Sequence, residues 1–403
     1  MKILVLAGGS DQIALITELR KRGHEIVLLD YFENPPAKNY ADKHIKASTL
    51  DIDVVLDIAK TEKVNLICTA CTDQALLTVA YVSERLGLPC YISYQTALNV
   101  TNKSYMKKVL EENSIPTSHF TVIENSDLSV LKDFKFPLVV KPVDCNSSKG
   151  VKRIEDVTEF EKYAKEAILF SRTHTAIVEE FKDGQEISAD FYIDHGMAKF
   201  LSATSSLKIK NRKSFTILCS NYPAINYEQE IALTNIASKI AKAFLLDNTP
   251  LLIQFIVNDE EINVIEFSAR MGGGSKYKLI EVLSGVNIMS KYVDLILGEK
   301  PSVNPSRQID YCKMVYVYCK PGIYDHAEGL KELKDNGIID DFFLYKSSGM
   351  EITGAETSSD RSAGYLITGT SKEELQRKLL LADSIIKIIS KSGNDIMIHN
   401  LLR

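Results

Sequence analysis

Four side chains that could take part in phosphate chemistry lie in one predicted hairpin. Its second strand, VIEFSAR, places Glu266, Ser268 and Arg270 on one face, because successive side chains of a strand point to opposite faces. The first strand, LLIQFIV, carries Gln254. A three-residue loop at residues 259–261 puts Gln254 opposite Glu266, on the same face.

This set is suited to a metal-bound phosphate. Gln254, Glu266 and Ser268 offer oxygen ligands, of which Mg²⁺ takes a few while phosphates and water complete its octahedron. Arg270 can stabilise charge on a phosphoryl group in transfer. A buried structural Glu–Arg pair is the alternative.

A second polar element follows an apolar strand in the stretch VVKPVDCNSSKGV. Lys141 ends the strand, where an isolated ammonium is costly unless it meets an anion. Ser147, Ser148, Lys149 and Gly150 then form a small-residue turn that can wrap oxyanions with N–H groups, hydroxyls and an ammonium. The spacing is not that of a Walker P-loop, which excludes that class of NTPase. A polar hairpin turn with a lysine whose stem lies along the surface is the alternative.

The third polar element is IVEEFKDGQEISADF, where an apolar strand runs into Glu179, Glu180, Phe181 and Lys182. Such a strand end supplies backbone donors and acceptors for a flat base. Glu186, just past the turn, could reach ribose hydroxyls. An exposed hairpin with a charged solvated face is the alternative.

The bulk composition narrows the class of protein. A chain of 403 residues suggests about two to four domains. The net charge of -5 gives no basic footprint for nucleic acid, and no apolar run is long enough for a membrane span. The seven cysteines are scattered, which favours reduced thiols and a cytoplasmic protein.

The first hundred residues alternate short apolar strands with helical segments. Strands are expected at residues 3–7, 26–30, 64–69 and 91–93. Such alternation is typical of a parallel, doubly wound α/β sheet. Later helices are expected from Thr101 to before Pro116, and over residues 157–170, 228–245 and 372–390.

In this order, the three polar elements resemble those of the ATP-grasp superfamily, which includes carbamoyl phosphate synthetase, biotin carboxylase, phosphoribosylglycinamide synthetase and the L-amino acid ligases. The C-terminal stretch SSDRSAGYLITGTSKEEL is similar to the part that closes the biotin-carboxylase-like branch. The resemblance implies an α/β chain of three parts: a Rossmann-like pre-ATP-grasp domain at 1–100, an ATP-grasp domain at 101–300 with a mobile lid at about 120–182, and a small α+β domain at 301–403.

The resemblance also implies roles for single residues. Lys103 and Lys141 would hold the α- and β-phosphates under a mobile loop at residues 147–150. Residues 179–182 would be the adenine hinge, with the backbone of Glu180 and Lys182 facing the base, and Glu186 would bind the ribose.

The remaining roles follow from the hairpin. Gln254, Glu266 and Ser268 would bind the metal, and Arg270 would lie beside the γ-phosphate. Ser268 departs from the family's Glu-x-Asn-x-Arg pattern, since serine is a shorter and weaker ligand than asparagine.

The implied reaction joins a small-molecule carboxylate to an amine. ATP, with Mg²⁺ or Mn²⁺, phosphorylates the carboxylate to an acyl phosphate, and the amine displaces phosphate to form an amide-type bond. No nucleic acid or membrane partner is expected, and a homodimer is left open.

Two substrate classes compete within this reaction. An amino acid ligase would bind a substrate carboxylate with Arg270, Lys276 and the backbone of Gly272, Gly273 and Gly274. A phosphoribosylglycinamide synthetase (phosphoribosylamine–glycine ligase) would need a phosphate site near Gly8-Gly9 or Asp73. The ending RMGGGS favours the amino acid ligase.

Two other classes remain as alternatives. An NAD-dependent oxidoreductase is suggested by Gly8-Gly9 and by Asp30 at the end of the next strand, but the last glycine of G-x-G-x-x-G is missing. A non-catalytic nucleotide sensor would bind ATP without turnover.

The departure at Ser268 generates the first prediction. We expect Glu266→Ala to abolish ATP-dependent phosphate release while leaving the fold intact, because it removes the one carboxylate of the set. Ser268→Asn should keep or raise activity. Inactive, folded Ser268→Asn protein would show that the serine does not stand in for a metal ligand.

Overall fold

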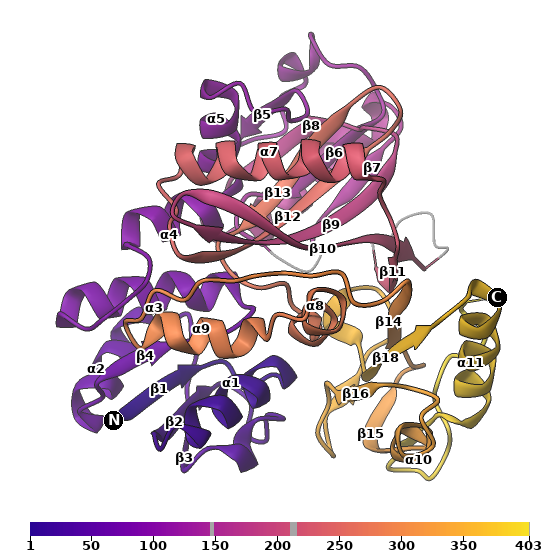
Figure 1. The fold of residues 1–403 in the computed structure, drawn as a ribbon. Coiled ribbons are helices and arrows are strands. Elements are labelled where there is room, and N and C mark those ends of the chain that lie inside the picture. Colours follow the sequence, from indigo (N-terminus) through magenta and orange to yellow (C-terminus); the bar gives the residue numbers. More distant parts are fainter. Residues whose placement is uncertain (146–148, 210–215, 403) are drawn as a thin grey trace.

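The computed structural model describes residues 1–145, 149–209 and 216–402 (Figure 1). Among these residues no helix is both long enough and apolar enough to cross a membrane. All seven cysteines are free.

The N-terminal part is a four-stranded parallel sheet in the order β3-β2-β1-β4, which confirms the expected α/β class. Its side chains alternate strictly: Ile3 and Val5 pack on one face with α1, and Leu4 and Leu6 pack on the other with α2 and α3. Its elements are β1 (Lys2–Leu6), α1 (Ser10–Lys21), β2 (Glu25–Asp30), β3 (Lys43–Lys46), α2 (Ile52–Glu62), β4 (Leu66–Cys68) and α3 (Asp73–Leu86).

The strand expected at residues 91–93 is wrong. These residues form a bend that leads into α4 (Tyr94–Thr101). Ser93 caps this helix, since its Oγ accepts a hydrogen bond from the Thr96 N–H at 3.1 Å. The next helix, α5 (Lys103–Glu112), begins after the N-cap Asn102.

The region expected to be a lid forms a separate antiparallel sheet in the order β5-β8-β6-β7, called the lid sheet below. A helix covers one face with Phe160 and Ala164, packed on Leu138 and Val140. The elements are β5 (Phe120–Ile123), β6 (Leu138–Pro142), β7 (Lys152–Ile154), α6 (Phe160–Phe170) and β8 (Ala176–Glu180).

The centre of the molecule is an eight-stranded sheet in the order β13-β12-β9-β10-β11-β14-β18-β16. A long helix, α7 (Tyr227–Ala243), lies across it (Figure 1). Three of its strands come from the C-terminal part, so residues 301–403 share this sheet with the ATP-grasp region. The strands are β9 (Gln185–Asp194), β10 (Met197–Lys208), β11 (Ile217–Tyr222), β12 (Thr249–Val257), β13 (Ile262–Ser268), β14 (Tyr311–Val317), β16 (Asp341–Leu344) and β18 (Ala363–Gly369).

The rest of the C-terminal half packs beside this sheet. Its elements are α8 (Lys276–Ser284), α9 (Ile288–Ile296), β15 (Gly322–Glu328), α10 (Leu330–Asp335), β17 (Glu351–Ile352), α11 (Lys372–Ile385) and β19 (Lys387–Ser390). The helix expected to reach residue 390 is therefore wrong beyond Ile385. The isoleucine-rich end favours a strand, and β19 pairs with β15.

The connection from β8 to β9 joins the two sheets. The strand–turn–strand expected around residues 179–186 is not a hairpin, because β8 pairs within the lid sheet and β9 lies in the central sheet. Residues 181–184 therefore connect the β5-β8-β6-β7 sheet to the central sheet, and a ligand bound between the two sheets would lie close to this connection.

The β12–β13 hairpin has the pairing expected, with Gln254 opposite Glu266. The loop differs, because Val257 already pairs with Ile262 and residues 258–261 form the turn. A register shift between Gln254 and Phe255 then restores the pairing. The extra loop residue shifts the register by one, and the bulge shifts it back. Gln254 and Glu266 therefore still lie on the same face of the sheet.

The sheet-changing connection depends on Gly184, which generates the second prediction. Its φ is +151°, and a Cβ there would lie 2.7 Å from the Val257 carbonyl oxygen. Gly196 also has a positive φ, +74°, but its Cβ would meet no heavy atom within 4 Å. Gly184→Ala should therefore lower the free energy of unfolding by about 1–3 kcal/mol more than Gly196→Ala in urea denaturation. Equal losses would contradict the close contact as the cause.

Candidate active site

Lys103, the first lysine predicted to bind a phosphate, lies next to Glu266, the carboxylate predicted to bind the metal. Lys103 opens α5, and Asn102 Oδ1 caps that helix by accepting from the Ser104 N–H at 2.9 Å. The Lys103 Nζ lies 3.2 Å from Glu266 Oε2 and donates to the Cys145 carbonyl oxygen at 2.8 Å. Burial opposes the charge of Lys103, but Glu266 outweighs it and raises the lysine's pKa. Two residues expected at the triphosphate thus meet.

Lys141, the second lysine predicted to bind a phosphate, forms an ion pair with Glu179 on β8, the strand that leads into the predicted adenine hinge. Lys141 Nζ on β6 donates to Glu179 Oε2 on β8 at 2.9 Å. The other oxygen, Glu179 Oε1, lies 3.1 Å from the Nζ of Lys107. Burial and the nearby Lys141 charge lower the pKa of Lys107 to about 8, against the opposing effect of Glu179.

Sequence reasoning missed Lys107. The signal was present, because Lys103 and Lys107 are four residues apart and share one face of a helix.

The three residues proposed as metal ligands, Gln254, Glu266 and Ser268, lie on the β12–β13 hairpin, and only one of them is a carboxylate. Glu266 and Ser268 share a strand face, and Gln254 lies opposite Glu266. Among the described residues no group of three or more His, Cys, Asp or Glu side chains could hold a metal. A donor set with one carboxylate fits Mg²⁺ whose remaining ligands are phosphate oxygens and water. The metal-binding roles remain predictions.

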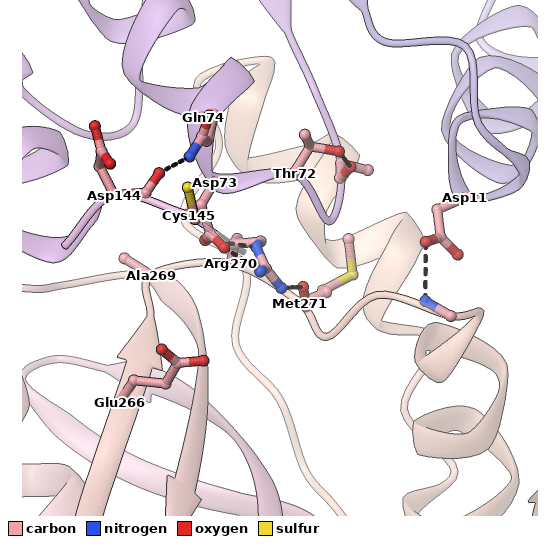
Figure 2. A network of polar contacts seen from close by, with 12 residues as sticks. Asp11, Thr72, Asp73, Gln74, Asp144, Cys145, Glu266, Ala269, Arg270 and Met271 are labelled. Atoms are coloured by element: carbon pink, nitrogen blue, oxygen red, sulfur yellow. Dashed lines mark hydrogen bonds and ion pairs between the residues drawn. The ribbon is translucent and has the colours of Figure 1, made fainter. Parts of the chain in front are cut away.

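Arg270 is fixed by the N-terminal part. Its Nε donates to Asp73 Oδ1 at 2.7 Å, its Nη2 donates to Asp73 Oδ2, and its Nη1 donates to the Met271 carbonyl oxygen at 2.6 Å (Figure 2). Asp73 begins α3, so the ion pair joins the end of the metal strand to the parallel-sheet part. The proposed role of Asp73 in binding a substrate phosphate would require this ion pair to open.

The same helix end also contacts the loop after Lys141. Gln74 Nε2 donates to the Asp144 carbonyl oxygen (Figure 2). Lys149 in that loop is exposed, and Gly150 has a φ of +70°. Ser147 and Ser148, proposed for the phosphate loop, lie outside the described residues.

The loop at residues 272–275, called the glycine loop below, packs against carboxylates. Asp11 on α1 accepts from the N–H groups of Gly274 at 3.1 Å and Ser275 at 2.8 Å. Burial raises the pKa of Asp11, against the effect of these two bonds. A Cβ on Gly272 would lie 2.7 Å from Lys276 Cδ and 3.3 Å from Asp190 Oδ1. A substrate carboxylate bound by the Gly274 N–H would therefore have to displace Asp11.

Lys276 is buried beside these groups. Its Nζ donates to Ser188 Oγ. Burial lowers the pKa of Lys276, although the charge of Asp190 opposes the shift. Gly273 is more open, since the nearest atom to a Cβ there would be the Cys71 carbonyl oxygen at 3.5 Å.

Arg361, which sequence reasoning did not single out, faces the glycine loop from the C-terminal part. Its guanidinium carbon lies 3.5 Å from the centre of the Tyr316 ring, and its Nη1 would be 2.4 Å from a Cβ on Gly274. It donates weakly to Tyr318 Oη at 3.4 Å and Ser358 Oγ at 3.3 Å. Within the part of the chain that the structure describes, no carboxylate forms an ion pair with it.

The hinge segment has a defined backbone. The Glu180 N–H donates to the His119 carbonyl oxygen, and the Phe181 N–H donates to the Pro137 carbonyl oxygen, each at 3.0 Å. The Lys182 Nζ lies 3.1 Å from Glu261 Oε1. The proposed ribose ligand Glu186 lies 2.6 Å from Lys208 Nζ.

The Gly8-Gly9 turn is arranged unlike a dinucleotide site. The Asp30 carboxylate accepts from the N–H of Gly8 at 2.7 Å and of Phe32 at 2.8 Å. A Cβ on Gly8 would lie 2.5 Å from Pro35. Asp30 closes its own turn and is buried, so it is not available to a ribose.

The chain is similar to known ATP-grasp proteins in sequence and in fold. Residues 134–278 match the model of the ATP-grasp domain. The chain is 26% identical over 321 residues to the phosphoribosylamine–glycine ligase of Thermococcus kodakarensis, which covers 73% of each chain. The solved L-amino acid ligase of Bacillus licheniformis superposes with a TM-score of 0.80 at 22% identity, over 97% of this chain and 98% of that one. The phosphoribosylglycinamide synthetase of Anaerococcus prevotii gives 0.75 at 20%, over 97% and 99%.

Residues 134–278 thus match the ATP-grasp domain family, and the chain as a whole has the fold of solved ATP-grasp ligases. The relatives named above are ligases, and a further solved structure of the same fold, the biotin carboxylase domain of the Hydrogenobacter thermophilus 2-oxoglutarate carboxylase, is a complex with MgADP.

The Arg270–Asp73 pair generates the third prediction. Asp73→Ala leaves a buried guanidinium without its partner and should lower the free energy of unfolding by about 3–5 kcal/mol. Asp335→Ala breaks the exposed Lys331–Asp335 pair and should cost about 0–1 kcal/mol. Chemical denaturation measures both. The double variant Asp73→Ala/Arg270→Met should regain part of the loss, and no recovery would show that the ion pair is not the cause.

Proposed function

We propose that this protein is an ATP-dependent carboxylate–amine ligase that acts on an amino acid. The γ-phosphoryl group of ATP passes to a carboxylate oxygen and ADP leaves. The amine nitrogen then attacks the acyl carbon, the bond to the phosphate oxygen breaks, and the amine loses a proton. The products are an amide-type bond, ADP and phosphate.

One observation carries this proposal: Lys103 Nζ lies 3.2 Å from Glu266 Oε2. A cation suited to a phosphate and a carboxylate suited to Mg²⁺ come from different elements and meet between the lid sheet and the central sheet. Mg²⁺, when bound, would neutralise phosphate charge, and Glu266 with Gln254 and Ser268 would hold it. Lys141 and Arg270 supply further positive charge to the same region.

The hinge would bind the base through its backbone. The N–H groups of Glu180 and Phe181 already donate within the protein, so a donor to adenine from this segment would be the Lys182 N–H. Glu186 would exchange its contact with Lys208 for the ribose hydroxyls. Closure of the lid over the triphosphate belongs to the same proposal.

The carboxylate substrate would lie between the glycine loop and Arg361. Arg270 is held by Asp73, and Lys276 is close to Asp190. Arg361 is therefore the guanidinium in this region without a carboxylate partner among the residues described. An amino acid would place its carboxylate against Arg361 and Gly273.

A second candidate is phosphoribosylamine–glycine ligase. A cavity of about 440 Å³ lies at the N-terminus of α1, lined by Ser10, Ile13, Tyr277 and Lys346 among others. A helix N-terminus and a lysine suit a sugar phosphate. This cavity favours the second candidate, whereas the guanidinium of Arg361 beside the glycine loop favours the first.

The fourth prediction separates these candidates by phosphate release with ATP and Mg²⁺. Pairs of amino acids should give turnover, and phosphoribosylamine with glycine should not. Turnover with phosphoribosylamine and glycine alone would reverse the assignment, and no turnover with any pair would overturn the ligase.

Arg361→Met should then raise the KM of the carboxylate substrate by about 10- to 100-fold, the effect of one charged hydrogen bond, with little change in the KM of ATP. Lys331→Met, in the exposed Lys331–Asp335 pair, is the control and should leave both KM values unchanged.

A further inference from the structure

Three charged side chains form one buried cluster, to which the lid sheet contributes Lys141 and Glu179 and α5 contributes Lys107. Lys107 is 0% exposed, Lys141 4% and Glu179 5%. The carboxylate uses one oxygen for each lysine, at 3.1 Å to Lys107 and 2.9 Å to Lys141. A buried charge is stable only where it is paired, and here two ammonium groups share one carboxylate.

The two lysines are held unequally. Lys107 Nζ also donates to Thr117 Oγ1 and lies 3.3 Å from the Val264 carbonyl oxygen, so three separate segments fix it. Lys141 has a single partner in the described parts of the chain, Glu179, and it ends β6 just before the proposed phosphate loop. Lys141 is therefore the lysine that can turn toward a ligand while Lys107 stays in place.

We propose that Lys107 is a positioning residue for the nucleotide: by holding Glu179, it lets Lys141 exchange that carboxylate for a phosphate of ATP. The inference rests on the proposed function, in which Lys141 binds a phosphate. Lys107 itself does not touch the nucleotide.

The physical reason is the cost of leaving Glu179 alone. With Lys107 present, Glu179 keeps a cation when Lys141 leaves. Without Lys107, the departure of Lys141 leaves a buried carboxylate unpaired, so the phosphate must compete with Glu179 for the only ammonium. Removing Lys107 therefore weakens ATP binding through Glu179, and removing Glu179 as well should cancel the effect.

The test is titration calorimetry of MgATP into the full chain and its variants. Lys107→Met should weaken binding by about 10- to 100-fold, and the double variant Lys107→Met/Glu179→Gln should return to within about threefold of the wild type. Lys108→Met is the matched control. It lies next to Lys107 on α5, is exposed, and approaches only Glu112, at 3.9 Å, so its affinity should equal that of the wild type.

Each other outcome contradicts the inference in a different way. Unchanged affinity in Lys107→Met would show that Glu179 does not restrain Lys141. Equal weakening in the single and double variants would show that Lys107 acts by direct contact or by general structure, since a structural defect is not repaired by Glu179→Gln. If Lys107→Met does not fold, a double variant that folds but binds weakly overturns the inference. A wild-type chain that binds no MgATP overturns the proposed function itself.

Discussion

The pairing of buried positive charge is the constraint on which this structure depends. Four lysines are buried in the described chain: Lys103, Lys107, Lys141 and Lys276. Glu266 pairs with Lys103, and Glu179 pairs with both Lys107 and Lys141. The charge of Asp190 acts on Lys276. Because an unpaired charge in a low-dielectric interior is costly, Lys107 and Lys141, which share the single carboxylate of Glu179, would be stabilised by a further anion. In the proposed function, the triphosphate of ATP would supply that negative charge.

The same constraint explains why distant segments converge. In a parallel sheet the loops after the strands lie at the carboxyl ends of the strands, and there Asp11 lies in the first turn of α1 and Asp73 begins α3. Asp11 binds the glycine loop, Asp73 binds Arg270, and Gln74 binds the loop after Lys141. The N-terminal part therefore contacts both the segment after β13, through Arg270, and the loop after β6, through Asp144. It acts as the support of the candidate site even though few of the proposed nucleotide contacts come from it.

The overall fold could be predicted from the sequence because the hydrophobic pattern is periodic. The alternation of strands and helices predicted the parallel sheet, and strand alternation placed Gln254 and Glu266 opposite each other. That pairing was right although the loop was longer than expected, since a bulge restored the register. Short runs failed where a local cap or tertiary pairing decided the outcome, as at Ser93 and at β19.

The partners within the site were harder to predict. Asp73 and Arg270 are far apart in the sequence, and nothing in either stretch announces a bidentate pair. Asp11 and Arg361 likewise reach the glycine loop only through the fold. Lys107 is different, because its spacing from Lys103 placed it on the same helix face and a helical reading by face would have found it.

The central claim is that the buried cations bind the phosphates of ATP. The most direct measurement is calorimetric titration of the wild-type chain with ATP, ADP and AMP in the presence of Mg²⁺. The account predicts that affinity falls steeply as each phosphate is removed, with AMP binding weakest by a wide margin. Equal affinity for the three nucleotides would contradict it, because recognition would then rest on the adenosine alone.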